Sequence, residues 1–198
     1  WPSPTKGYSL SELPKTPAGT LIIAGSLTPQ TKKQVQIARE AGVLSAQLDT
    51  RLLFTEIKRQ QEMERLIQWA APALADGQTV LIHSAQEASL IDETLEIAVG
   101  SGFNRIAGNR MVSKTLGEIA QILVSTTGIK RLILAGGETA GDACRSLGII
   151  GNLVLKEIQS GLPSGLSRGR EELLLVLKSG SFGSPDFFLQ AIKHLAVL

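Results

Sequence analysis

The sequence predicts an α/β fold, with a mostly parallel sheet and helices on both of its faces. Candidate strands and helices alternate along nearly the whole chain, which favours strands joined by helical crossovers. Two apolar runs, 132–135 and 173–177, contain no polar residue, a pattern typical of strands buried on both faces. Each run leads into a glycine-containing turn. Because ligands of open α/β sheets bind beyond the carboxyl ends of the strands, these turns are the first candidates for a site.

Length and composition favour a globular protein with a small-molecule partner. The chain has 198 residues, of which 43% are hydrophobic and 19% charged, enough to bury a substantial core. A formal net charge of +2 is small, so we expect no nucleic-acid partner. No run approaches about 18 apolar residues, and the single cysteine, Cys144, cannot form an internal disulfide. We therefore expect a cytoplasmic protein without a membrane span.

Residues 1–19 predict an extended linker, because they contain four prolines among serine, threonine and glycine. Residues 20–198 are then expected to form the folded domain. A chain that opens on such a linker, without an initiator methionine, is expected to be the trailing part of a longer protein.

The first strand-to-helix turn contains Ser26. A β-prone run at 20–24 precedes it, and Thr28 and Pro29 after it suit the cap and the first turn of a helix that continues to Ala41. The Ser26 hydroxyl either contacts a ligand at this turn or simply belongs to the helix entry. The residues alone leave both interpretations open.

The middle of the chain continues the alternation. We predict a brief strand at 46–49, an amphipathic helix at 54–74, a strand at 79–82, and helices at 87–100 and 110–127.

Polar residues at two places in this middle part are considered for a site. His83 ends the 79–82 strand, but no Cys, Asp or second His stands at a metal-ligand spacing from it, so a structural role is favoured. Asn109 and Arg110 lie near the predicted start of the 110–127 helix, where polar contact with a ligand or a partner domain is one interpretation that the spacing does not require.

The second strand-to-helix turn is the Gly136-Gly137 pair, which follows the 132–135 strand and precedes Glu138-Thr139. Such a junction points free backbone N–H groups and the positive end of a helix dipole at one place, which suits a phosphate or a carboxylate. Thr139 either caps the helix or offers its hydroxyl to the anion. An ordinary tight turn explains the glycines equally well at this point.

The last quarter of the chain begins after a short helix that stops at Gly148. An edge strand is predicted at 153–158. The glycine- and serine-rich segment 160–169 is predicted to be flexible. It either closes over a ligand or rests against a partner domain, or it forms a hairpin-like connection.

The strand at 173–177 leads into Lys178 and a small-residue turn that contains Gly180. Lys178 either faces a phosphate or is a solvated strand-end lysine. A final apolar helix is predicted at 185–195.

Four segments together resemble the nucleotide-binding C-terminal domain of the four-carbon acid sugar kinases. In the family's order they are 24–34, 136–139, 157–163 and 178–183. The resemblance covers nearly the whole chain from about Leu21 onward. It implies binding of ATP with Mg²⁺, and an acid sugar held by a separate N-terminal domain. The Asp-Asp-containing motif of that N-terminal domain does not occur in this sequence.

The resemblance implies six nucleotide-binding residues: Ser26, Gly136, Gly137, Glu138, Thr139 and Gly180. The phosphates are expected at Gly136 to Thr139, with Ser26 and Gly180 framing the rest of the site. Glu138 is a candidate to hold the magnesium ion through water. No catalytic residue and no protein metal centre is assigned, because the base that activates the sugar is expected in the other domain.

The sequence thus predicts the ATP-binding part of a kinase that phosphorylates a four-carbon, tetronate-type acid sugar. We expect the chain to be inactive without its N-terminal domain. Two alternatives are a non-catalytic nucleotide-binding regulatory module and an α/β enzyme that acts on a phosphorylated metabolite. A homodimer is also left open.

Overall fold

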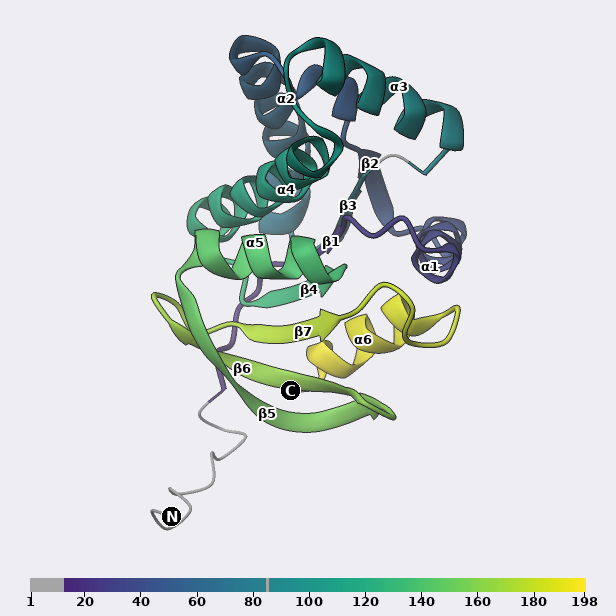
Figure 1. The fold of residues 1–198 in the computed structure, drawn as a ribbon. Coiled ribbons are helices and arrows are strands. Elements are labelled where there is room, and N and C mark those ends of the chain that lie inside the picture. Colours follow the sequence, from purple (N-terminus) through teal and green to yellow (C-terminus); the bar gives the residue numbers. More distant parts are fainter. Residues whose placement is uncertain (1–12, 85) are drawn as a thin grey trace, which may run out of the picture.

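The computed structural model describes residues 13–84 and 86–198 (Figure 1). The strands are β1 (Thr20–Ala24), β2 (Leu44–Gln47), β3 (Thr79–His83), β4 (Arg131–Ala135), β5 (Ile149–Gln159), β6 (Leu162–Gly169) and β7 (Leu174–Lys178). The helices are α1 (Pro29–Glu40), the short 3-10 helix η2 (Thr50–Leu52), α2 (Glu56–Ala75), α3 (Ala88–Gly100), α4 (Arg105–Thr127), α5 (Gly137–Leu147) and α6 (Phe187–Ala196).

One seven-stranded sheet organises the described residues, in the order β2-β3-β1-β4-β7-β6-β5. The pairs from β2 to β7 are all parallel, whereas β6 is antiparallel to β7 and β5 is antiparallel to β6. The predicted α/β class with a mostly parallel sheet is therefore confirmed. The antiparallel pairs are confined to the end of the sheet that carries the β5–β6 hairpin.

Helices cover both faces of the sheet, because successive residues of the central strands point to opposite sides. In β1, Leu21 and Ile23 enter one core with apolar residues of α2, α4 and α5, while Ile22 and Ala24 enter a second core with α1 and α6. Figure 1 shows these two helical layers on either side of the sheet. None of the described helices is both long enough and apolar enough to cross a bilayer.

Two of the predicted elements have different boundaries because a capping side chain that was not predicted sets where a helix begins. The helix predicted at 110–127 begins at Arg105, since the Asn104 side chain accepts a hydrogen bond of 2.8 Å from the backbone N–H of Ala107. The strand predicted at 46–49 is β2, which ends at Gln47. Asp49 instead caps η2 by accepting a hydrogen bond from the N–H of Arg51.

The segment 160–169 is not a flexible loop, so of the two predicted alternatives the hairpin is correct. Most of it is β6, a buried strand paired with both β5 and β7. Its serines are buried because they find partners. Ser164 Oγ donates to the Lys156 carbonyl at 2.9 Å, and Ser167 Oγ donates to the Glu171 carbonyl at 3.0 Å. Local hydrogen bonding therefore lets a small-polar sequence enter the sheet.

The proposed linker at 1–19 falls largely outside the described residues, which begin at Leu13. From Leu13 to Gly19 the chain forms no helix or strand. Leu13 and Ala18 are buried against the domain, and the Gly19 N–H donates to the Leu74 carbonyl at 2.7 Å. The division into a linker and a domain that begins at residue 20 stays a prediction.

Candidate functional site

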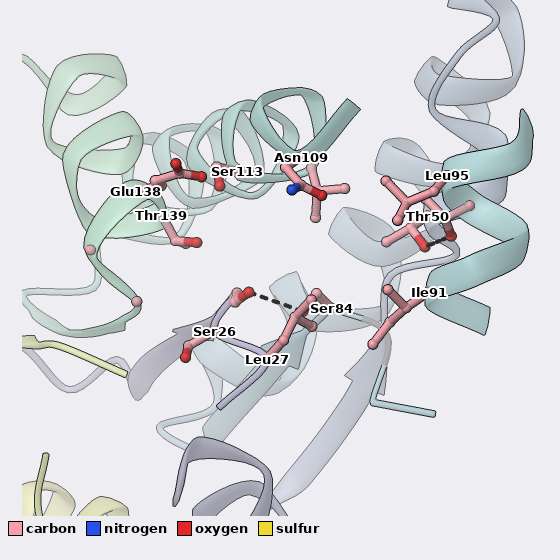
Figure 2. A pocket seen from close by; sticks show the side chains of 15 residues that line it. Ser26, Leu27, Thr50, Ser84, Ile91, Leu95, Asn109, Ser113, Glu138 and Thr139 are labelled. Atoms are coloured by element: carbon pink, nitrogen blue, oxygen red, sulfur yellow. Dashed lines mark hydrogen bonds between the residues drawn. The ribbon is translucent and has the colours of Figure 1, made fainter. Parts of the chain in front are cut away.

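A cavity of about 240 Å³ opens at the carboxyl ends of the neighbouring strands β1 and β4 (Figure 2). The chain leaves β1 toward α1 on one face of the sheet and leaves β4 toward α5 on the other face. Adjacent strands whose connections diverge in this way leave a crevice between their end loops, which is where open α/β sheets bind ligands. The topology therefore places a cavity between the two turns that the sequence singled out.

Five of the six predicted site residues line this cavity. They come from the β1–α1 turn and from the β4–α5 turn, and are Ser26, Gly136, Gly137, Glu138 and Thr139. The remaining lining residues come mainly from α3 and α4, and are Gly25, Leu27, Thr50, Ser84, Ile91, Thr94, Leu95, Asn109, Val112 and Ser113.

The N-terminus of α5 faces the cavity with unpaired backbone donors. Gly137, Glu138 and Thr139 are the first three residues of this helix, so their N–H groups have no acceptor within it, and no side chain caps it. Gly136 precedes them at φ 118°, a conformation that favours glycine, and a Cβ added there would lie 3.1 Å from the Ser26 nitrogen. Three N–H groups and the positive end of the helix dipole thus converge on one spot.

The electrostatics of the cavity are unusual for an anion site, because no Lys, Arg or His is found among the described residues that line it. Glu138, an acid, is the single charged residue among them. Positive potential therefore comes from the α5 backbone, assisted by the hydroxyls of Thr139 and Ser26. A polyanionic ligand also needs a cation from elsewhere to offset Glu138.

Glu138 also bears on whether a metal ion fits this site. Among residues 13–84 and 86–198, no three His, Cys, Asp or Glu side chains cluster to hold a metal. Mg²⁺ does not require such a cluster, because it keeps several waters and binds through one or two carboxylates plus the phosphates of a substrate. A single carboxylate beside an anion site fits a magnesium ion that arrives with its phosphates.

The opposite side of the cavity is apolar and was not predicted from the sequence. Ile91 and Leu95 of α3, Val112 of α4 and the turn residue Leu27 form it. Helical spacing made the α3 and α4 residues look like ordinary core positions. Asn109, which the sequence did single out, projects into the same space from α4 (Figure 2).

The sixth predicted residue, Gly180, does not line the cavity but lies against Ser26. A Cβ added to Gly180 would come within 2.2 Å of Ser26 Oγ, so only glycine allows this approach. The Gly180 carbonyl accepts hydrogen bonds from Thr28 Oγ1 at 2.7 Å and Thr31 Oγ1 at 2.9 Å. The structure therefore joins the β7–α6 turn to the β1–α1 turn directly behind the cavity wall.

Lys178 occupies neither of its two predicted environments. It is 1% exposed and does not line the cavity. Its Nζ donates to the carbonyls of Ser179 at 2.9 Å and Gly180 at 3.0 Å, and to Thr31 Oγ1 at 3.1 Å. Burial lowers the pKa of Lys178 to about 8. This lysine holds the Gly180 turn in place.

His83 has the structural character that the sequence favoured. It is 2% exposed, its Nδ1 lies 2.8 Å from the Ser84 carbonyl, and burial lowers the pKa of its imidazole. It does not line the cavity, whereas Ser84 does, with its Oγ donating to the Gly25 carbonyl at 3.2 Å. The histidine therefore supports the wall from behind.

Comparison with known proteins finds similarity over most of the chain. The family model described as a nucleotide-binding C-terminal domain matches residues 21–188. A 3-oxo-tetronate kinase of Pseudomonas savastanoi is 34% identical over 178 residues, which cover 90% of this chain and 39% of that protein. A 3-oxo-isoapionate kinase of Paraburkholderia graminis is 30% identical over 174 residues, covering 84% of this chain and 37% of that protein. This chain thus spans about two fifths of the length of these curated relatives.

Solved structures show the same fold. A Haemophilus influenzae protein superposes with a TM-score of 0.72 at 26% identity, covering 92% of this chain and 42% of its own. A Bordetella bronchiseptica domain of unknown function, crystallised with citrate as a domain-swapped dimer, superposes with a TM-score of 0.73 at 19% identity. The second likeness covers 90% of this chain and 41% of that one, and shows the fold alone.

Proposed function

Because this chain belongs to the nucleotide-binding C-terminal domain family of four-carbon acid sugar kinases, we propose that its cavity binds ATP for such a kinase. The reaction would transfer the terminal phosphoryl group to a tetronate-type acid sugar. The kinase names of the relatives support this proposal, and the matches at 34% and 30% identity extend over most of this chain.

The α5 N-terminus is the observation that carries the proposal. Its three unpaired N–H groups offer donors to the phosphates, and Thr139 and Ser26 add hydroxyls from either side. A Cβ added to Gly137 would meet no atom within 4 Å, so a ligand has unobstructed access to the backbone there. Gly180 supports this arrangement through its contact with Ser26.

Magnesium enters the proposal with the nucleotide. Glu138 would hold it through water at the edge of the phosphate site, which explains an acidic residue where an anion binds. A bound Mg²⁺ neutralises charge on the phosphates during phosphoryl transfer. The chain's own part is to position the phosphates with backbone donors and to keep Glu138 beside them.

The acid sugar and the catalytic base belong, in this proposal, to an N-terminal domain that meets the cavity from outside. Within residues 13–84 and 86–198 no cationic side chain lines the cavity, so a partner that supplies one would complete the charge balance. We assign no catalytic residue to this chain and expect no kinase activity from it alone. Cytoplasmic location and a homodimer remain part of the proposal.

Isothermal titration with ATP, with and without Mg²⁺, tests the proposal, with a sugar phosphate as the control ligand. Saturable ATP binding that Mg²⁺ strengthens is the expected result. Preferential binding of the sugar phosphate would instead identify an α/β enzyme for a phosphorylated metabolite. ATP binding without phosphoryl transfer to a tetronate after an N-terminal domain is added would favour a regulatory module.

A further inference from the structure

We infer that the apolar end of the cavity holds the nucleotide base and that Asn109 selects adenine over guanine there. This inference rests on the proposed ATP-binding function and adds the part of the site that distinguishes one nucleotide from another. It is carried by the division of the cavity into a polar end and an apolar end.

The two ends of the cavity differ in chemistry. Glu138, Thr139 and the open N–H groups of α5 lie at one end, while Ile91 and Leu95 lie across from them on α3 (Figure 2). A nucleotide has the same asymmetry, with charged phosphates at one end and a flat, largely apolar base at the other. Phosphates at α5 therefore direct the base toward α3.

The α3 wall is held in place before any ligand binds. Thr94 Oγ1 donates to the Leu90 carbonyl at 2.6 Å and is hydrogen-bonded to Thr50 Oγ1. Arg51 also forms an ion pair with Glu93 at 3.2 Å, which joins η2 to α3 again. Both threonine hydroxyls are occupied by these bonds, so this end of the cavity presents mainly apolar surface. A preformed apolar wall reduces the ordering cost of binding a base.

Asn109 is the unpaired polar group at this end. Its side chain points into the cavity and hydrogen-bonds to no described residue (Figure 2). The Asn109 amide has a carbonyl oxygen that accepts hydrogen bonds and an NH2 group that donates them. The oxygen can accept from the N6 amino group of adenine while the NH2 group donates to N7. Guanine presents two acceptors, O6 and N7, on the same edge and leaves the amide oxygen facing an acceptor.

Ser113 lies between the apolar end and the polar end of the cavity. It lies one turn beyond Asn109 on the same face of α4, between Asn109 and Glu138 (Figure 2). It is 6% exposed and lines the cavity. A ribose between a base at Asn109 and phosphates at Glu138 would pass beside this hydroxyl. The order of residues along the cavity therefore matches the order of groups along a nucleotide.

The test compares ATP, GTP and inorganic tripolyphosphate by isothermal titration, in wild type and in two variants. Asn109→Ala removes the amide. Its control is Gln121→Ala, which removes an amide from the same helix at a position that does not line the cavity. Leu95→Ser removes part of the apolar wall, with Ile97→Ser as its control, because Ile97 is 40% exposed on α3 and does not line the cavity.

We expect wild type to prefer ATP over GTP, and Asn109→Ala to reduce that preference roughly tenfold, as loss of a bidentate base contact should. Leu95→Ser should weaken the binding of ATP but leave the affinity for tripolyphosphate unchanged. Neither control variant should change the affinity for either ligand. If ATP binds but the cavity variants behave like their controls, the base lies elsewhere and this inference is wrong. If neither ATP nor tripolyphosphate binds, the proposed function itself fails.

Discussion

The Nζ atom of Lys178 lies 3.1 Å from the Oγ1 atom of Thr31, which is 147 residues earlier in the chain. This contact joins the end of β7 to the first turn of α1. Both residues also bind the Gly180 carbonyl, at 3.0 Å and 2.9 Å. The position of the turn behind Ser26 thus depends on a charge buried between two distant segments.

Burial of Lys178 predicts a change in stability at alkaline pH. Its pKa is about 8 in the folded protein, whereas an unfolded lysine keeps its proton to about pH 10.4. Between these values the unfolded state binds more protons, so stability should rise with pH by up to ~1.4 kcal/mol per pH unit. Urea denaturation of wild type and Lys178→Met at pH 7.5, 8.5 and 9.5 measures the difference.

The control for that series is Lys156→Met, since Lys156 is exposed on β5. The wild-type free energy of unfolding should rise relative to Lys178→Met as the pH increases, and should run parallel to that of Lys156→Met. If the free energy of unfolding of Lys178→Met also changed with pH in parallel with that of wild type, the pKa of Lys178 would not be lowered by burial.

Gly137 and Gly136 should respond differently to the same substitution. Gly137→Val should weaken ATP binding by about tenfold or more, or ~1.4 kcal/mol, while the melting temperature stays close to wild type. The reason is that a Cβ at Gly137 meets no protein atom and enters only the space offered to the ligand.

Gly136→Val should instead destabilise the fold by ~1–2 kcal/mol, because its φ of 118° strains a side-chain-bearing residue. Thermal unfolding and ATP titration of both variants provide the comparison. A Gly137→Val protein that unfolds as easily as Gly136→Val would mean that Gly137 is mainly structural, and the site assignment would lose its main support.

Glu138→Gln should reduce the dependence of ATP binding on magnesium. Removing the carboxylate removes its repulsion of free ATP and its attraction for the ion, each worth roughly 1 kcal/mol or about fivefold in affinity. Titrations with and without Mg²⁺ should therefore converge. Glu64→Gln, on the exposed face of α2, makes the same charge change away from the cavity and should retain the wild-type dependence. An unchanged Mg²⁺ effect in Glu138→Gln would place the ion elsewhere.

His83 predicts a loss of stability in weak acid. Its pKa is lowered by burial, so below about pH 6.5 the unfolded state binds a proton that the folded state resists. The free energy of unfolding of wild type should fall relative to that of His83→Gln between pH 7 and pH 5, by up to ~1.4 kcal/mol per pH unit. Taking the difference cancels the contribution of His194, which both proteins share. A constant difference would contradict the buried neutral imidazole.

Several local features were predictable because they depend on short stretches of chain. The apolar runs at 132–135 and 173–177 became the central strands β4 and β7, since a strand buried on both faces needs no polar residue. Thr28 and Pro29 begin α1 as predicted, because capping involves only neighbouring residues. The structure of segment 160–169 was ambiguous because it does not depend on local sequence alone. Its buried serines need hydrogen-bond partners outside the segment, such as Lys156 and Glu171.

The candidate site divides in the same way. The sequence located Ser26 and the Gly136 to Thr139 turn, because glycines and hydroxyls at strand ends indicate ligand access from local pattern alone. It did not locate Ile91 and Leu95 in the cavity wall, since nothing in an amphipathic helix tells which of its apolar residues will face a cavity.

By itself, the sequence determined the class of fold, the glycine turns at the strand ends and the family to which the chain belongs. Only the tertiary structure decided the strand order, the apolar wall formed by α3, and the burial of Lys178. The physical reason is that backbone conformation is set mainly by neighbours in sequence, whereas burial and hydrogen bonding are set by neighbours in space. Lys178 is buried because Thr31 and the carbonyls of its own turn surround it.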